Sequence, residues 1–150
     1  MPIVPTDEQL GELLADTRQT PVVMINLLRF KAEAEGQKAI DGESGEQAYK
    51  RYAEAMRRLV ESGGGRFLWM GKVDQVVIGD SGERFDAAAL VEYPSRSAFI
   101  EIAMKAEQTG ISGDRAAGLD SQWLFASTSE FSLADQSAVD PPANAQPADD

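Results

Sequence analysis

The run VVMINLLRF, which follows Pro21, is apolar at both odd and even positions except at Asn26 and Arg29. A strand with one wet face alternates apolar and polar residues, whereas a strand covered on both faces is apolar throughout. The run therefore predicts a strand that is covered on both faces. Any fold of this chain must therefore cover both faces of this strand.

Two segments carry the pattern of a capped helix start. Thr6 with Gln9 predicts a short helix in TDEQLGELLADT, and Ser44 with Gln47 predicts a longer one. The longer helix has an apolar stripe at the i, i+3, i+4, i+7 spacing, made of Tyr49, Tyr52, Ala53, Met56, Leu59 and Val60. The glycines at 63–65 end this helix, and residues 31–43 before it predict a long loop or arm.

The remainder predicts a hairpin, a helix and a last strand. RFLWMGKVDQVVIG indicates a long strand, bulged or bent at Gly71, and GDSG is a turn into a second strand, RFDAAALVEY. Pro94 and Ser95 open the helix SRSAFIEIAMKAE. Glycines at 110, 113 and 118 then break the chain before the strand SQWLFAST.

Without the first helix, the order is strand, helix, strand, strand, helix, strand. This order predicts an α+β fold of the ferredoxin-like βαββαβ type, with a four-stranded antiparallel sheet and helices on one face. We expect a helical extension at 1–19, the ferredoxin-like domain at 20–130, and a disordered acidic tail rich in Ala and Pro at 131–150.

The second face of the sheet predicts a partner. Apolar residues on both parities would leave Met24, Leu28, Leu90 or their neighbours exposed, in a patch too large for a monomer. A second copy of the chain is the natural cover, so we expect a homodimer.

Charge and missing residue types exclude several functions. Fourteen Lys and Arg against 25 Asp and Glu give a net charge of −11, which repels nucleic acid and anionic lipid. The chain lacks cysteine and histidine, so it has no thiolate, no imidazole base and none of the common zinc or haem ligands. We therefore expect no metal site and no cofactor. No run is apolar enough to span a bilayer, which favours a cytoplasmic protein without a membrane partner.

Five segments, INLLRF, AYKRYAEAM, GGRFLWMGKV, LVEYPSRSAFIE and RAAGLDSQWLFA, occur in this order. In order and spacing the chain resembles the domain of unknown function 1330 family, of the dimeric α+β barrel superfamily, over roughly residues 20–128. The resemblance implies a homodimer whose two sheets pack face to face, with a pocket in each subunit between sheet and helices. Where that family often has histidine before the arginine of RAAGL, this chain has Asp114.

Polar residues that interrupt apolar segments are the candidates for a ligand site. Asn26 interrupts the first strand, Tyr52 lies on the helix stripe, and Arg115 could fork onto a carboxylate unless it pairs with Asp114, Asp120 or Glu92. Arg66 and Trp69 have opposite parity, so on a regular strand only one of them would face the helices. The predicted ligand-binding residues are Asn26, Tyr52, Arg66, Trp69 and Arg115.

No motif fixes a reaction, so the sequence identifies no catalytic residue and leaves open whether the protein is an enzyme. The favoured function is the binding of a small organic molecule with a carboxylate or carbonyl group. The alternatives are a cofactor-independent oxygenase or isomerase of the same superfamily, in which these residues would stabilise an anion, and a structural interaction module.

Overall fold

The computed structural model describes residues 3–80 and 84–131. This part of the chain forms four helices and four strands. In chain order they are α1 (Asp7–Ala15), β1 (Val22–Phe30), α2 (Gly45–Ser62), β2 (Arg66–Lys72), β3 (Ala87–Tyr93), α3 (Arg96–Thr109), α4 (Ser112–Gly118) and β4 (Leu119–Ser127).

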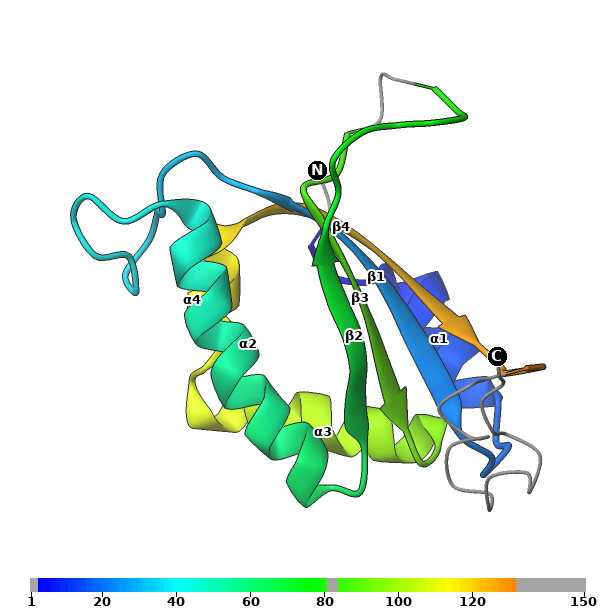
Figure 1. Cartoon of the computed structure of the whole chain (residues 1–150). Coiled ribbons are helices and arrows are strands. Elements are labelled where there is room, and N and C mark those ends of the chain that lie inside the picture. The colour runs from blue at the N-terminus through cyan, green and yellow to red at the C-terminus, as the bar shows by residue number, and fades with distance from the viewer. Residues whose placement is uncertain (1–2, 81–83, 132–150) are drawn as a thin grey trace, which may run out of the picture.

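The strands form one antiparallel sheet in the order β2-β3-β1-β4. Figure 1 shows α2, α3 and α4 on the same side of this sheet. The predicted ferredoxin-like α+β fold is therefore confirmed. Within the described ranges, no helix is long and apolar enough to cross a membrane.

Both predicted capping boxes are present. The Thr6 hydroxyl accepts from the Gln9 amide at 3.1 Å and begins α1. Ser44 and Gln47 make the same reciprocal pair at the start of α2. Each box satisfies two backbone donors that a bare helix start would leave without partners, which is why these two starts could be read from sequence.

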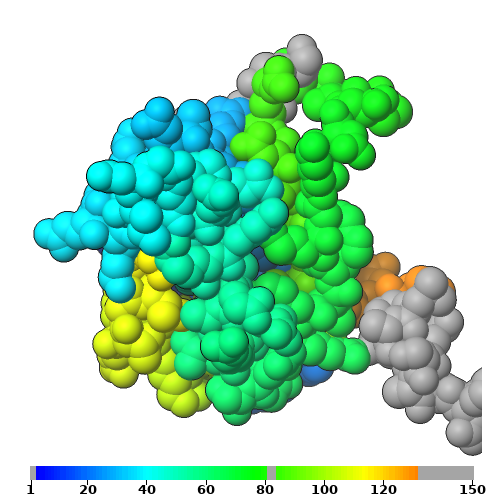
Figure 2. Space-filling model, turned by 60° about the vertical axis from the view of Figure 1, so that its left-hand side comes forward, coloured from blue at the N-terminus to red at the C-terminus, as the bar shows by residue number. Residues whose placement is uncertain are grey.

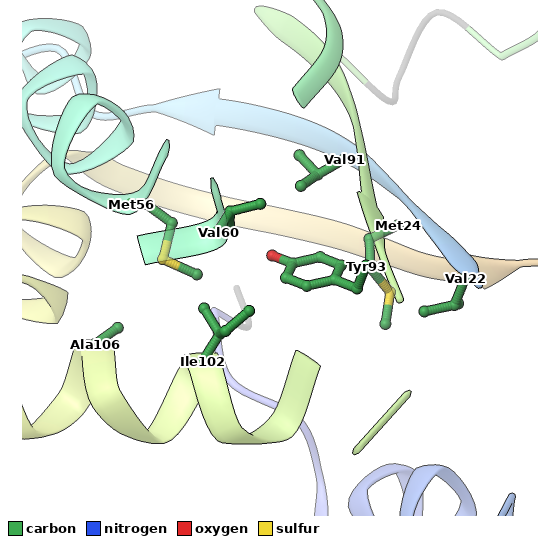
Figure 3. Close-up of a cluster of buried hydrophobic side chains, with 8 residues drawn as sticks. All are labelled: Val22, Met24, Met56, Val60, Val91, Tyr93, Ile102 and Ala106. Atoms are coloured by element: carbon green, nitrogen blue, oxygen red, sulfur yellow. The ribbon is translucent and has the colours of Figure 1, made fainter. Parts of the chain in front are cut away.

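The core lies between the helices and one face of the sheet. Figure 3 shows side chains from β1, β3, α2 and α3 meeting there, with the Tyr93 ring pointing its hydroxyl toward Met56 and Val60. Met24 and Leu28 are buried on this helix-facing side, so of the residues named in the expectation it is their neighbours that lie on the second face. The residues between them, including Ile25 and Leu27, belong to the other face because side chains alternate along a strand.

The β2–β3 connection differs from the predicted long hairpin. Strand β2 ends at Lys72, which pairs with Ala87, the first residue of β3. Residues 73–79 therefore have no partner strand, and Val77 and Ile78 are 80% and 94% exposed. The Val73 amide donates to the Asp86 carbonyl at 3.0 Å and closes the base of this loop, which rises beyond the end of the sheet in Figure 1.

The segment before the last strand was expected to be broken chain, but residues 112–118 form α4. Its backbone packs closely on α2, since a methyl group at Gly118 would lie 2.1 Å from the Gly45 carbonyl oxygen. Strand β4 begins directly after the helix, at Leu119. Of the expected tail at 131–150, all but Phe131 lies outside the described residues.

Candidate functional site

The sheet register separates the five predicted residues into two groups. Asn26 pairs with Ala89 and Leu124 and lies on the helix-facing side. Arg66 pairs with Glu92, and Trp69 pairs with Leu90, both on the opposite, open side. The structure therefore brings Asn26, Tyr52 and Arg115 to the helix side and places Arg66 and Trp69 elsewhere.

A β-bulge between Phe67 and Trp69 puts Arg66 and Trp69 on one face. The extra residue shifts the alternation by one position, so residues of opposite parity point the same way. Gly71, where the bend was expected, instead leaves room for the Trp69 ring, because a methyl group at Gly71 would lie 2.2 Å from it. The expectation that the irregularity lies at Gly71 was wrong.

A chain of hydrogen bonds crosses the helix-facing side of the sheet. Arg115 donates from Nη2 to the Gln122 Oε1 at 2.6 Å, and Gln122 Nε2 donates to Asn26 Oδ1 at 2.7 Å. The Asn26 amide nitrogen in turn donates to the Met24 carbonyl at 3.2 Å. Each side-chain amide can pair both its oxygen and its nitrogen in only one orientation. The network therefore fixes the position of the Arg115 guanidinium.

Three tyrosines lie between the helices and the sheet, and Tyr49 and Tyr52 are close enough to Arg115 for its charge to act on their pKa values. Tyr49 and Tyr52 come from α2, with ring centres 5.3 Å apart, and Tyr93 comes from β3. Burial raises the pKa of the Tyr52 phenol above its ordinary value, while the nearby Arg115 charge acts in the opposite direction. Burial also raises the pKa of both Tyr49 and Tyr93. All three phenols are therefore neutral hydrogen-bond donors near pH 7.

Arg115 is half-buried and lacks an anionic partner among the residues that the structure describes. Of the acids proposed as its partner, Asp114 pairs with Arg51 at 3.1 Å, and Glu92 pairs with Arg66 at 2.8 Å. The contacts of Arg115 are instead two neutral oxygens, the Gln122 side chain and the Ile3 carbonyl. A partly desolvated guanidinium favours a carboxylate over such neutral acceptors.

Figure 2 shows a narrow opening at the surface between the side chains of α2 and β2. Two hollows lie elsewhere on the described surface. One of about 700 Å³ is lined by the 31–43 arm and the α3–α4 turn, and one of about 360 Å³ lies near Phe30 and Lys72. Neither is lined by a tyrosine. Within the described ranges, no group of three or more acids could hold a metal ion.

The open face of the sheet carries a row of apolar side chains from all four strands. Trp69, Leu90, Ile25 and Phe125 stand opposite one another across the sheet. Trp69 is 53% exposed and Phe125 is 45% exposed, and Trp123 beside them is 43% exposed. A patch of this kind, exposed in one copy of the chain, is typical of an interaction surface.

Sequence reasoning missed Gln122 as a member of the helix-side network. Gln122 has one available signal, since it occupies the same parity in the last strand as Leu124, an apolar residue. Its link to Asn26 depends on the pairing of β1 with β4, which no local pattern reveals.

Comparison with known proteins identifies structural relatives whose function is also unknown. No model of a known protein family and no curated protein matches the chain. The chain is similar to the crystal structure of RPA0582, a protein of unknown function from Rhodopseudomonas palustris, with 28% identity and a TM-score of 0.74 over 83% of this chain and 94% of that one. The structure of methylated RPA0582 gives 28% identity and a TM-score of 0.75 over 85% and 94% of the two chains. These similarities agree with the ferredoxin-like fold.

Proposed function

We propose that this protein binds a small organic acid between α2 and the sheet, with Arg115 as the anchor for the carboxylate. The carrying observation is the half-buried guanidinium, which faces neutral oxygens and has no anionic partner within the described residues. A carboxylate would complete two charge-assisted hydrogen bonds there. Apolar groups of the ligand would lie on Leu28, Tyr49 and Tyr52.

Binding is favoured over catalysis by the chemistry of the same groups. The phenols, the amides and the guanidinium supply hydrogen-bond donors, but no hydrogen bond or ion pair joins them to a carboxylate in the described part of the chain. An oxygenase or isomerase without a cofactor needs a base or an acidic substrate. The raised pKa values of the three tyrosines make them poor bases near pH 7.

We also propose that the protein is a homodimer of the dimeric α+β barrel type, as in the domain of unknown function 1330 family. The exposed aromatic side chains of the open face support this proposal, since a second copy would cover them. The proposed ligand-binding residues Asn26, Tyr52 and Arg115 lie on the other side of the sheet, so each subunit would hold its own site.

The test is a calorimetric titration of the protein and of Arg115→Lys with a panel of aliphatic and aromatic carboxylates. Losing a bidentate charge-assisted contact of about 1.5–3 kcal/mol should weaken binding by roughly ten- to a hundredfold. Arg66→Lys is the matched control, because Arg66 makes an exposed ion pair on the open face and should leave affinity unchanged. Equal affinities for the protein and Arg115→Lys would contradict the proposal.

A further inference from the structure

The N-terminal segment reaches into the candidate site at Ile3. The Ile3 carbonyl oxygen accepts a hydrogen bond from Arg115 Nη2, and the side chain of Ile3 packs on the cluster that contains Leu28, Tyr49 and Leu119. The next residue, Val4, is 67% exposed. Ile3 therefore is the point at which this segment enters the space between sheet and helices.

Ile3 has the two features that a ligand of this site would need. It offers an oxygen to the guanidinium and a branched four-carbon side chain to the apolar cluster. Its carbonyl is a weaker partner than a carboxylate, because a neutral acceptor gains less from a cationic donor than an anion does. An acid of similar shape would satisfy the same contacts better.

We propose that Ile3 is an intramolecular stand-in for the ligand, and that the ligand is a short branched aliphatic acid that displaces it. The inference rests on the proposed binding of an acid at Arg115. Ile3 and the ligand would compete for the same donor and the same apolar surface. The apparent affinity is then reduced by the fraction of molecules in which Ile3 occupies the site.

The N-terminal segment before Thr6 can leave the candidate site without disturbing helix α1. Thr6 caps α1 through its own side chain and Gln9, so α1 keeps its start when residues before Thr6 move. The contact between Ile3 and Arg115 is the anchor that opposes departure. Exchange of Ile3 for a ligand would therefore leave the sheet and the helix starts in place.

The test uses 3-methylpentanoate, which carries a carboxylate and the same branched side chain as isoleucine. We expect Ile3→Gly, and a chain shortened to begin at Thr6, to bind this acid about tenfold more tightly than the full chain. Val4→Gly is the matched control. The Val4 side chain is exposed, so its removal should leave affinity unchanged. Arg115→Gln in the shortened chain should abolish binding. Thermal melting of each variant checks that it is folded.

The outcomes separate this inference from the proposed function. If Ile3→Gly and the shortened chain bind as the full chain does, and Arg115→Gln still removes binding, the stand-in role of Ile3 is wrong while the acid site stands. If phenylacetate gains more than 3-methylpentanoate from the deletion, the branched aliphatic class is wrong. If folded variants bind no carboxylate, or bind equally without Arg115, both the inference and the proposed function fail.

Discussion

Arg51 and Arg115 stand on opposite sides of Asp114 and have opposite surroundings. Arg51 donates to Asp114 and also pairs with Glu43, so it holds the arm against α4. Successive helical residues point about 100° apart, so α4 turns Asp114 toward Arg51 and Arg115 toward the sheet. Asp114, the acid next to Arg115 in the sequence, therefore does not pair with the Arg115 guanidinium. This separation leaves Arg115 without a carboxylate partner in the described residues, as the proposed acid site requires.

The tyrosines give a prediction for pH. Burial raises the pKa of all three phenols, so the folded protein should hold their protons to a higher pH than an ordinary phenol, whose pKa is about 10. The chain has three tyrosines, so phenolate absorbance near 295 nm should stay low in the folded protein and appear upon unfolding.

The raised pKa values of the tyrosines also predict how the stability of the fold changes with pH. A pKa raised in the folded state means that the unfolded state loses its proton first, so stability is full below about pH 10 and falls as pH rises further. Urea melts at pH 8, 10 and 11 should show a decreasing midpoint over the upper interval. Phenolate absorbance that develops fully while the protein stays folded would show that the rings are solvated.

At this scale the sequence predicted part of the candidate site. Asn26 and Arg115 stood out because a polar residue in an apolar strand, and an arginine after a glycine-broken segment, need partners. The sequence could not show that Arg66 and Trp69 share the open face, because the bulge at Leu68 depends on pairing with β3, which is a long-range contact. Gln122 was missed for the same reason, since its partner Asn26 is 96 positions away in the chain.

Element packing sets the position of Arg115. Helices α2 and α4 cross where Gly45 and Gly118 bring their backbones together. Helix α4 begins without a side-chain cap. Its contact with α2, rather than a local capping signal, therefore holds it in position. The absence of a cap also explains why α4 was not predicted, whereas α1 and α2, which have capping boxes, were.

Gly118→Ala should therefore destabilise the fold and weaken acid binding. The added methyl group would lie 2.1 Å from the Gly45 carbonyl oxygen and 2.8 Å from the Tyr49 amide nitrogen. Both are backbone atoms that cannot rotate away, so we expect a loss of about 1–3 kcal/mol in urea unfolding. Carboxylate affinity should fall as well, because α4 carries Arg115.

Gly11→Ala is the control for this substitution. Gly11 lies in α1, and a methyl group there would meet nothing within 4 Å. Alanine has the higher helix propensity, so stability should rise by up to about 1 kcal/mol and binding should not change. If Gly118→Ala is as stable as the parent, the close approach of the two helices is not what positions Arg115.

In the whole molecule, the two faces of the sheet carry different kinds of residues. The helix-facing side holds the core and the polar network, and the open side presents Trp69, Trp123 and Phe125 to solvent. The doubly apolar first strand predicted apolar side chains on both faces of the sheet, and Ile25 and Leu27 lie on the open one. What the sequence alone could not show is which residues share each face, since one bulge changes the assignment along β2.

Covering the open face with a second copy predicts a dimer in solution. The contact should bury more than about 1,000 Å², as stable interfaces do. Two chains of net charge −11 repel each other, so added salt should strengthen the dimer by screening that repulsion. Light scattering at micromolar concentration, in low and moderate salt, should give twice the monomer mass.

Trp123→Lys tests where that contact lies. Trp123 stands beside Phe125 on the open face, with ring centres 6.0 Å apart, so a buried ammonium there would replace an aromatic contact and lack a partner. Loss of an aromatic anchor worth at least about 2 kcal/mol should weaken association by roughly thirtyfold or more. Leu124→Lys is the control, because Leu124 is equally exposed at 43% but points to the other side of β4. A folded Trp123→Lys variant that keeps the dimer mass, or a Leu124→Lys variant that loses it, would place the interface away from the open face.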